Sequence, residues 1–331
     1  MKQEKLKQSI EKAFLWIENN SIKDEGIIVN TQMKISYPEV TGYYIPTLLT
    51  WKDKEKAISY SKWLCEVQSE SGSWKDPEGK IDCIFDTGQI FRGLLEVYQL
   101  TNDKNIKNTL EKSSQWLITQ IDDNGIINAP DVEAWDGTVP EYILLYALEP
   151  ILRVAELLKN EILIQKAKKA IDNYLSKNDL TNFSCLSHFH AYIMEALCDL
   201  GYKDRALEGM EIIEKLQRED GSIPAYIDKK WVCSTAMFQY AIVWYKLGKI
   251  EQADRVYDYA VNLQNQTGGW YGSYGEPYKI LSKLGRFIPS LKMYFPKAEI
   301  SWAVKYFLDA TELYSRNKNI ELSSIIPKKD R

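Results

Sequence analysis

Residues 62–74, KWLCEVQSESGSW, decide the fold of this chain, and residues 263–270, LQNQTGGW, match their later half. Each stretch places a glutamine before a glycine and then a tryptophan: Gln68, Gly72 and Trp74, and Gln264, Gly268 and Trp270. Apolar residues on one helical stripe precede the first stretch, and a more apolar segment begins near Asp86. The pattern predicts a helix, a glycine turn, a loop and a second, more apolar helix.

This unit recurs along the chain, and recurrence at a fixed pattern indicates a repeat architecture. A third copy has Gln120 and Gly125 before a helix at about 141–158, and a fifth has Gln217 and Gly221 before 235–247. The sixth second helix is 299–314. The first copy (Gly26, then 41–51) lacks the glutamine, and the fourth (second helix 188–200) lacks glutamine and glycine. Thr-Gly pairs at 41–42 and 87–88, each followed by Leu-Leu, support the register.

Six helical pairs can stack as an open solenoid or close into a ring. The second helices are apolar nearly all round, as expected of helices buried on several sides, whereas the first helices have a charged face. We therefore expect an all-α (α/α)6 toroid. It is predicted as a single domain over residues 1–315, followed by a polar tail, 316–331.

The composition excludes several classes of protein. The 331 residues, 38.4 kDa, with 45% hydrophobic residues, describe a globular chain, and a net charge of −4 argues against nucleic acid as a partner. No apolar run is long enough to span a membrane, and no secretory signal is visible. Five scattered cysteines without a CxxC pair fit a reducing compartment, so a cytoplasmic location is expected. The oligomeric state stays open.

The stretch from Trp63 to Trp74 resembles the QW repeat of the squalene cyclase and protein prenyltransferase superfamily, and 263–270 resembles its later half. Residues 86–95, 272–275 and 294–310 resemble bacterial six-hairpin toroid proteins that accompany surface-polysaccharide genes. The resemblance implies the toroid fold far more specifically than it implies a reaction.

Six-hairpin toroids that are enzymes use the end of the ring where the second helices begin. Unpaired backbone N–H groups and positive helix dipole ends converge there and favour polar or anionic ligands. The predicted catalytic residues at this rim are Asp86, Glu299, His188, His190, Asp136 and Glu141. The predicted substrate-binding residues are Glu39, Tyr43, Gln89, Arg92, Trp135, Trp231, Tyr271, Tyr274, Trp302 and Lys305.

One pattern within this set is sharper. Asp86 precedes Arg92 by the same interval as Glu299 precedes Lys305, so the repeats align the two carboxylates and the two cations. Two converging carboxylates suit glycosyl hydrolysis; a base with a cation on the sugar carboxylate suits elimination or epimerisation of a uronic acid. In the alternative interpretation Asp86 is a helix cap and Glu299 complements a helix dipole.

Neither a metal nor a cofactor is expected. The zinc-ligand types Asp82, Cys83, Cys185, His188 and His190 do not have the prenyltransferase spacing. The cyclase acid motif DxDD is missing, with Asp131-Val132-Glu133 a poor substitute, and DDxxD is missing too.

The sequence therefore predicts a carbohydrate-active enzyme, a hydrolase, lyase or epimerase, acting on a sugar or uronic acid of a bacterial surface polysaccharide. Trp16, Trp63 and Trp116 are expected to pack, and the rim aromatics to stack on a sugar. The glycine-rich stretch 270–297 is expected to lie over the mouth of the cavity. Two alternatives remain: a terpenoid cyclase or prenyltransferase relative, and a non-catalytic toroid that binds a glycan or a protein.

Overall fold

The computed structural model describes residues 2–134, 138–275 and 292–327. Within them, each predicted repeat is a first helix followed by a second helix. The six pairs are α1 (Gln3–Asn19) with α2 (Pro38–Thr50), α3 (Lys54–Glu66) with α4 (Ile84–Thr101), α5 (Lys104–Gln120) with α7 (Leu144–Leu157), α8 (Glu161–Leu175) with α9 (Ser187–Asp199), α10 (Lys203–Leu216) with α11 (Ser234–Lys246), and α12 (Ile250–Val261) with α13 (Ser301–Asn317). The predicted helix pairs are confirmed.

Short elements lie between these helices. The turns η1 (Glu141–Ile143) and η4 (Leu322–Ser324) are 3₁₀ helices, and α6 (Pro130–Ala134) is a short α-helix that the repeats do not predict. Strands β1 (Ile28–Asn30) and β2 (Met33–Ser36) form one small sheet, and β3 (Val232–Cys233) pairs antiparallel with β4 (Ser273–Tyr274).

Contacts divide the chain into two compact units. Unit 1 comprises Met1–Asn20, Asn30–Lys34 and Thr181–Arg331, and unit 2 comprises Ser21–Val29 and Ile35–Leu180. The expected single domain over 1–315 stays a prediction. In the expected tail, α13 continues to Asn317 and Ile325 is buried.

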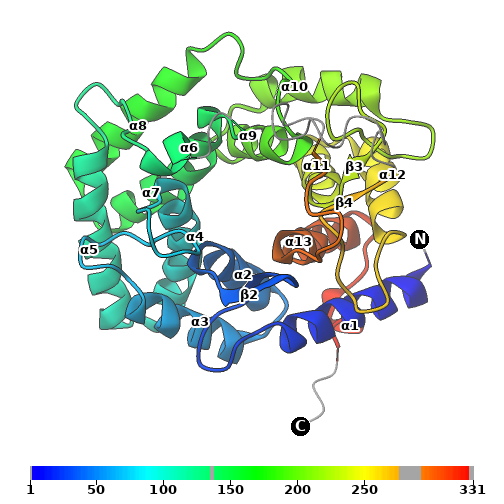
Figure 1. The fold of residues 1–331 in the computed structure, drawn as a ribbon, viewed down its shortest axis with the longest axis horizontal. Coiled ribbons are helices and arrows are strands. Elements are labelled where there is room, and N and C mark those ends of the chain that lie inside the picture. Colours follow the sequence, from blue (N-terminus) through cyan, green and yellow to red (C-terminus); the bar gives the residue numbers. More distant parts are fainter. Residues whose placement is uncertain (1, 135–137, 276–291, 328–331) are drawn as a thin grey trace. The chain divides into compact units, whose positions relative to one another are not determined.

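Unit 2 has two rows of helices. The second helices α2, α4 and α7 pack side by side, and the first helices α3, α5 and α8 form the other row (Figure 1). The Thr-Gly pairs explain the close packing: a Cβ on Gly42 would lie 2.6 Å from Cα of Ile90, and one on Gly88 would lie 2.8 Å from Cα of Ala147. Only glycine allows these helices to approach so closely.

Unit 1 repeats this arrangement. The second helices α9, α11 and α13 form one row, and α10, α12 and α1 pack against them (Figure 1). Every residue of α11 from Ser234 to Tyr245 is buried, as the apolar sequence predicts. The first helix of the chain, α1, therefore packs on the last helix, α13.

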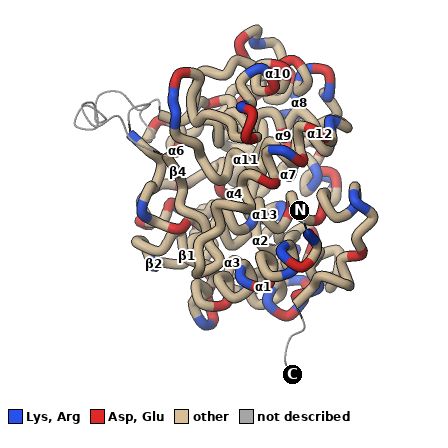
Figure 2. The backbone as a smooth tube through the Cα atoms, turned by 90° about the vertical axis from the view of Figure 1, so that its right-hand side faces the viewer, with Lys and Arg blue, Asp and Glu red and all other residues tan. Residues whose placement is uncertain are grey.

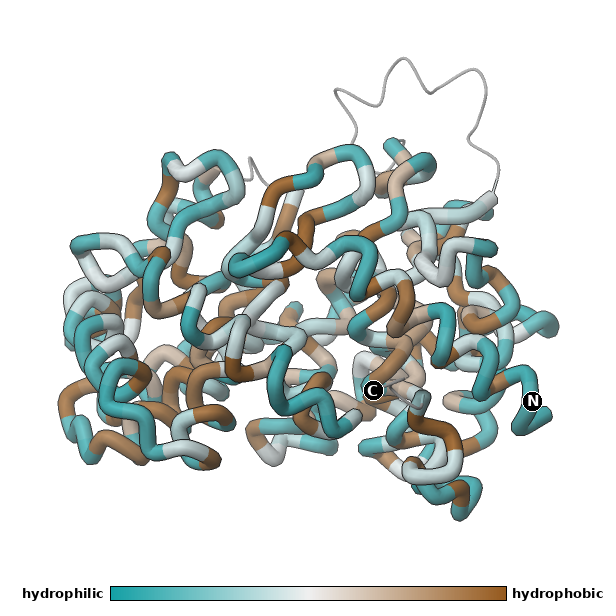
Figure 3. The backbone as a smooth tube through the Cα atoms, turned by 90° about the horizontal axis from the view of Figure 1, so that it is seen from below, coloured by the Kyte–Doolittle hydropathy of each residue, from teal (hydrophilic) through white to brown (hydrophobic). Residues whose placement is uncertain are grey.

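The first helices are amphipathic. In α12, Ala253, Val256, Tyr257 and Ala260 are buried, while Glu251 lies on the exposed side. Charged positions mark α10 and α12 in Figure 2, and hydrophobic and hydrophilic positions alternate along the tube in Figure 3. In the described part of the chain, no helix is both long and apolar enough to cross a membrane.

The glutamine of the motif joins neighbouring first helices. Its Nε2 donates to the carbonyl of the motif glycine and to a carbonyl of the next first helix. The pairs of acceptors are Gly72 and Thr109 for Gln68, Gly221 and Gln252 for Gln217, and Gly268 and Ser9 for Gln264, all at 2.9–3.3 Å. The acceptor of Gln264 is in α1, so in this contact the first helix of the chain follows the last repeat.

The motif tryptophans are structural. Nε1 of Trp74 donates to the carbonyl of Leu64, and Nε1 of Trp270 donates to that of Ala260, each at 2.8 Å. Gln120 departs from the pattern because it stands five residues before its glycine, and the carbonyl of Ile121 instead accepts from Nζ of Lys166 at 2.5 Å.

Gly268→Ala is expected to destabilise the protein by roughly 2–4 kcal/mol. Gly268 has φ +98°, and a Cβ there would lie 2.1 Å from the carbonyl oxygen of Lys12. Gly248→Ala is the matched control, because its φ is +76° but no atom lies within 4 Å; it should cost about 1 kcal/mol. Urea unfolding measures both, and equal losses would show that the contact with α1 contributes nothing.

Candidate active site

Asp86 lies in the first turn of α4, deep in unit 2. The helix N-cap is Cys83, whose side chain makes no cap hydrogen bond, so Asp86 is not the cap. Its side chain is 1% exposed, and Oδ2 accepts a hydrogen bond of 2.7 Å from the hydroxyl of Tyr37, the N-cap residue of α2. The buried carboxyl group is therefore held by a tyrosine from the preceding repeat.

A second buried carboxyl group, that of Asp131 in α6, lies against the first turn of α4. Asp131 is also 1% exposed, and its Oδ2 accepts from the backbone N–H of Phe85 at 3.1 Å. Its Oδ1 is buried without a hydrogen-bond partner among the described residues. Asp131 thus contacts the first turn of α4 next to Asp86.

Burial raises the pKa values of both carboxyl groups above those of ordinary aspartates. Burial raises the pKa of Asp86 to about 8; the Tyr37 hydrogen bond opposes this rise and the Asp131 charge adds to it. Burial also raises the pKa of Asp131 to about 6, against backbone N–H groups that favour its ionised form. At neutral pH Asp86 is protonated and Asp131 is ionised.

Tyr37 is a hydrogen-bond donor over the whole working range of pH. Burial first, and then the charges of Asp86 and Glu39, raise its pKa well above 10.0. Glu39 and Tyr43, both predicted at the rim, are buried in α2 of the same unit. The ring of Tyr43 lies 6.3 Å from that of Tyr146.

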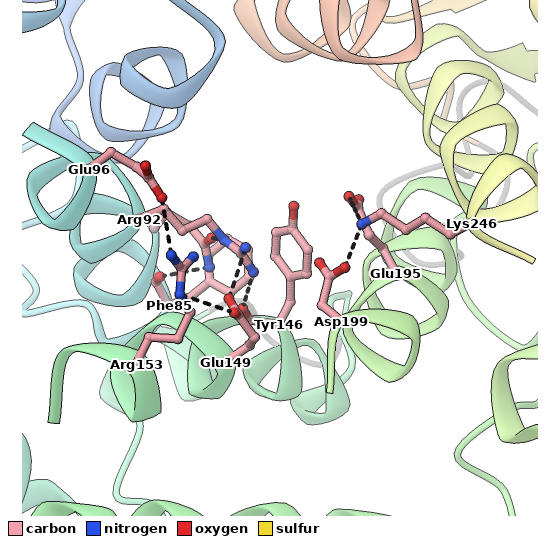
Figure 4. Close-up of polar contacts among 10 residues, drawn as sticks. Phe85, Arg92, Glu96, Tyr146, Glu149, Arg153, Glu195, Asp199 and Lys246 are labelled. Carbon is pink, nitrogen blue, oxygen red and sulfur yellow. Dashed lines mark hydrogen bonds and ion pairs between the residues drawn. The ribbon is translucent and has the colours of Figure 1, made fainter. Parts of the chain in front are cut away.

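Arg92 is engaged by protein partners on α4 and α7. Its guanidinium pairs with Glu149 at 3.0 Å and lies over the Tyr146 ring, 4.2 Å from the ring centre. Its Nε donates to Oε1 of Gln89 at 3.0 Å. Figure 4 shows this network continuing to Arg153 and Glu96. In this arrangement Gln89 and Arg92 tie α4 to α7.

Glu299 lies just before α13, in unit 1. Oε2 accepts from Nε1 of Trp16 at 2.7 Å, and Oε1 accepts from Nδ2 of Asn265 at 2.7 Å and from the hydroxyl of Thr267. Both carboxylate oxygens therefore hold neighbouring segments together. Asp86 belongs to unit 2, and the predicted convergence of the two carboxylates stays a prediction.

The two histidines lie on α9 in different surroundings. His190 is enclosed: Nδ1 is 3.0 Å from the Tyr240 hydroxyl and Nε2 is 3.2 Å from the carbonyl of Thr181. Nδ1 of His188 lies 2.6 Å from Oε1 of Gln239, its polar partner within the described part of the chain. Burial lowers the pKa of each histidine to about 4, so both are neutral at neutral pH.

Two of the remaining predicted residues have partners within their own units. Nζ of Lys305 pairs with Asp309 at 2.7 Å and lies 3.8 Å from the centre of the Tyr306 ring. Glu141 is exposed and accepts from the Tyr174 hydroxyl at 2.9 Å. Trp135 and Asp136 lie outside the described residues, as does 276–291 of the expected loop.

Four predicted aromatic residues lie in unit 1. Trp231 is buried beside Tyr226, with ring centres 5.9 Å apart. Tyr271 is exposed, and the centre of its ring lies 5.8 Å from that of the partly buried Tyr274. The Tyr274 hydroxyl accepts a hydrogen bond from the backbone N–H of Tyr271. Trp302 is partly buried in the first turn of α13. Tyr271 therefore has the most accessible ring of the four.

Across the described ranges, no group of three or more His, Cys, Asp or Glu side chains is placed to hold a metal ion. The five cysteines are free thiols. Burial raises the pKa of Cys83, next to the Asp86 site, so this thiol stays protonated.

Sequence reasoning missed Asp131 as a site residue. It lies in the short helix α6, which has no counterpart in the described residues of the other repeats. Its only signal in the sequence was its place in the weak Asp131-Val132-Glu133 resemblance to an acid motif. Asp131 is a candidate because the folded chain buries its carboxyl group against the first turn of α4.

Comparison with known proteins finds similar folds among solved structures. No family model matches the chain, and no curated protein matches its sequence. Among solved structures, an unsaturated glucuronyl hydrolase specific for heparin is similar with a TM-score of 0.69 and 13% identity, over 97% of this chain and 100% of that one.

Two further structures agree. The unsaturated glucuronyl hydrolase from Bacillus sp. GL1 has a TM-score of 0.68 and 12% identity, over 95% of this chain and 97% of that one. A possible GH105 member from Salmonella enterica serovar Paratyphi A has a TM-score of 0.71 and 13% identity, over 96% of this chain and 95% of that one. At this identity the likeness shows the fold alone, and it confirms the predicted all-α (α/α)6 toroid.

Proposed function

We propose that the protein is a carbohydrate-active enzyme that hydrolyses a saccharide containing a uronic acid, with Asp86 and Asp131 as its catalytic carboxyl groups. The observation that carries this proposal is the pair of buried carboxyl groups whose pKa values are raised by different amounts, to about 8 and about 6. Pairs of this kind divide acid and base roles at neutral pH. The similar structures named as glucuronyl hydrolases support the substrate class.

Each group has a distinct role in this reaction. Asp86 gives its proton to the leaving oxygen as the carbon–oxygen bond breaks. Asp131, ionised, takes a proton from the water whose oxygen bonds to the carbon. Because the Tyr37 hydroxyl donates to Oδ2 of Asp86, the transferable proton is on Oδ1. In elimination or epimerisation, Asp131 would again be the base, and it would take its proton from the sugar ring.

We propose further that the uronic acid belongs to a bacterial surface polysaccharide. A cytoplasmic location is also part of the proposal and is supported by the five free thiols. The sequence also predicts Glu299, His188, His190, Glu141 and Asp136 as catalytic residues, but the proposed reaction gives none of them a step. The predicted aromatic and cationic residues stay predicted sugar contacts. The resemblance to QW-repeat cyclases and prenyltransferases stays a prediction, and no described contact favours their chemistry.

The test is a substrate panel. Purified protein is incubated with unsaturated uronyl oligosaccharides, saturated glucuronides and neutral glycosides, and products are followed by loss of ultraviolet absorbance and by mass spectrometry. Hydrolysis adds water, elimination creates a new absorbing double bond, and epimerisation leaves the mass unchanged. No product from any uronate would contradict the proposal.

A non-catalytic glycan-binding toroid is the second candidate, favoured by the near-complete burial of Asp86 and Asp131. It predicts that uronates bind without forming a product, and that Asp86→Asn leaves this binding unchanged.

Tyr37→Phe is expected to lower kcat roughly tenfold and to move the alkaline limb of the pH–rate profile upward. Losing the hydroxyl removes the bond that favours ionised Asp86, so the pKa of Asp86 rises further. Tyr60→Phe is the matched control, since its hydroxyl also forms a hydrogen bond to a side chain, that of Ser21 at 2.6 Å. A Tyr37→Phe profile identical to that of the Tyr60→Phe variant would remove Tyr37 from the mechanism.

A further inference from the structure

His188 and Gln239 form a buried polar pair in unit 1. His188 is in the first turn of α9 and Gln239 lies on the neighbouring helix α11. Nδ1 of His188 is 2.6 Å from Oε1 of Gln239, and the two side chains are 2% and 0% exposed. The catalytic proposal makes no use of this pair.

Each member has an unused polar atom. Among the described residues, Nε2 of Gln239 is buried without a hydrogen-bond partner. The hydrogen bond of His188 within the described residues is made by Nδ1, which leaves Nε2 available to a ligand. Burying an amide N–H without a hydrogen-bond partner is energetically unfavourable. A polar partner that the protein does not supply would remove this cost.

The chemistry of that partner does not depend on how the amide is oriented. If Nδ1–H of His188 donates to Oε1 of Gln239, the unused atoms are an N–H donor on the amide and an acceptor on the imidazole. If the amide is turned round, the unused atoms are an acceptor on the amide and a donor on the imidazole. Both arrangements present one donor and one acceptor, which is what a hydroxyl group needs.

The surroundings favour an uncharged ligand group. Burial lowers the pKa of His188 to about 4, so the pair has no charge at neutral pH. The imidazole lies 4.6 Å from the Tyr192 ring and 5.8 Å from the Tyr294 ring, between ring centres. Aromatic rings beside a hydroxyl-binding pair suit the C–H face of a sugar.

Two buried hydroxyl groups nearby in sequence are also unused. Ser187 precedes His188, and Thr235 is one turn before Gln239 on α11. Neither hydroxyl has a hydrogen-bond partner among the described residues, and both side chains are fully buried. This end of α9 and α11 therefore holds more polar groups than its protein contacts satisfy.

We infer that His188 and Gln239 bind a neutral hydroxyl group of a pyranose ring, and not its carboxylate. The inference rests on the proposed function only for the ligand being a sugar. The pair is a binding site and makes or breaks no bond.

The experiment uses the fact that the chain has only two histidines. The full-length Asp86→Asn variant, labelled with ¹⁵N at histidine, is titrated with methyl glucoside and with glucuronic acid and followed by NMR. Both sugars should shift the Nε2 resonance of His188. His190 is the internal control, because both of its nitrogens already have partners.

Gln239→Met keeps the length of the side chain and removes its amide. It should weaken binding of methyl glucoside about three- to tenfold, as expected for one hydrogen bond. Gln252→Met, on α12 of the same unit, is the matched control, and unchanged His190 resonances verify that the variants are folded.

A His188 Nε2 resonance that does not move would overturn the inference, since a resident water alone would then satisfy the pair. Equal affinity in Gln239→Met, or no binding of either sugar, would overturn it too. Turnover by the wild type with a silent His188 refutes only this inference. A His188 response with no turnover of any uronate supports it and refutes only the proposed hydrolysis.

Discussion

Asp86→Asn is expected to reduce kcat/KM on the best uronate substrate by roughly 10²–10⁴-fold. The amide keeps the shape of the carboxyl group and can still accept from Tyr37, but it has no proton to give to the leaving oxygen. Substrate binding should persist, because the change is isosteric. Asp172→Asn, an exposed position on α8, is the control and should turn over normally.

The same variant should be more stable at neutral pH. The folded pKa of Asp86, about 8, lies above its ordinary value of 3.8, so its contribution to stability is complete below pH 3.8 and is lost as pH rises towards 8. Each pH unit in this window costs up to ~1.4 kcal/mol. Asparagine does not titrate, so the variant should lose this slope.

Turnover and thermal unfolding from pH 4 to pH 8 test both consequences. An Asp86→Asn enzyme with normal kcat would exclude Asp86 as the acid. An unchanged pH slope of stability would show that Asp86 is ionised in the folded protein.

The fold could be predicted because one local arrangement is repeated. The Gln68 and Gln264 hydrogen bonds are the same geometry in two repeats, and that geometry requires glycine at Gly72 and Gly268. A local requirement that recurs leaves a visible pattern in the sequence. The Thr-Gly pairs recur for the same reason, since Gly42 and Gly88 both allow close helix packing.

The site could be predicted only in part. Asp86 follows from its place at the start of a second helix, whereas Asp131 lies in α6, which has no counterpart to align in the described residues of the other repeats. The partly buried ion-pair network of Arg92 was not predictable either, because it depends on Glu149 from another repeat. Aligning the repeats reveals only the residues that they share, and Asp131 and Glu149 are not among them.

Asp131→Asn is expected to lower kcat/KM by roughly 10²-fold or more while the protein stays folded. The amide oxygen can still accept from the backbone N–H of Phe85, so the contact with the first turn of α4 persists. The negative charge is lost, and with it the base. Because the Asp131 charge raises the pKa of Asp86, the alkaline limb of the pH–rate profile should also move downward.

Asp131→Ala separates the catalytic role from a structural one. It removes the acceptor for Phe85 and should cost a further 1–2 kcal/mol of stability, about the value of a helix cap. Asp53→Asn is the matched control, since Asp53 is a buried aspartate that accepts from the backbone N–H of Lys56 at the start of α3. If Asp131 only holds α4, then Asp131→Asn and Asp53→Asn will both keep full activity and an unshifted profile. Loss of activity in Asp131→Asn alone, without loss of stability, assigns the base to Asp131.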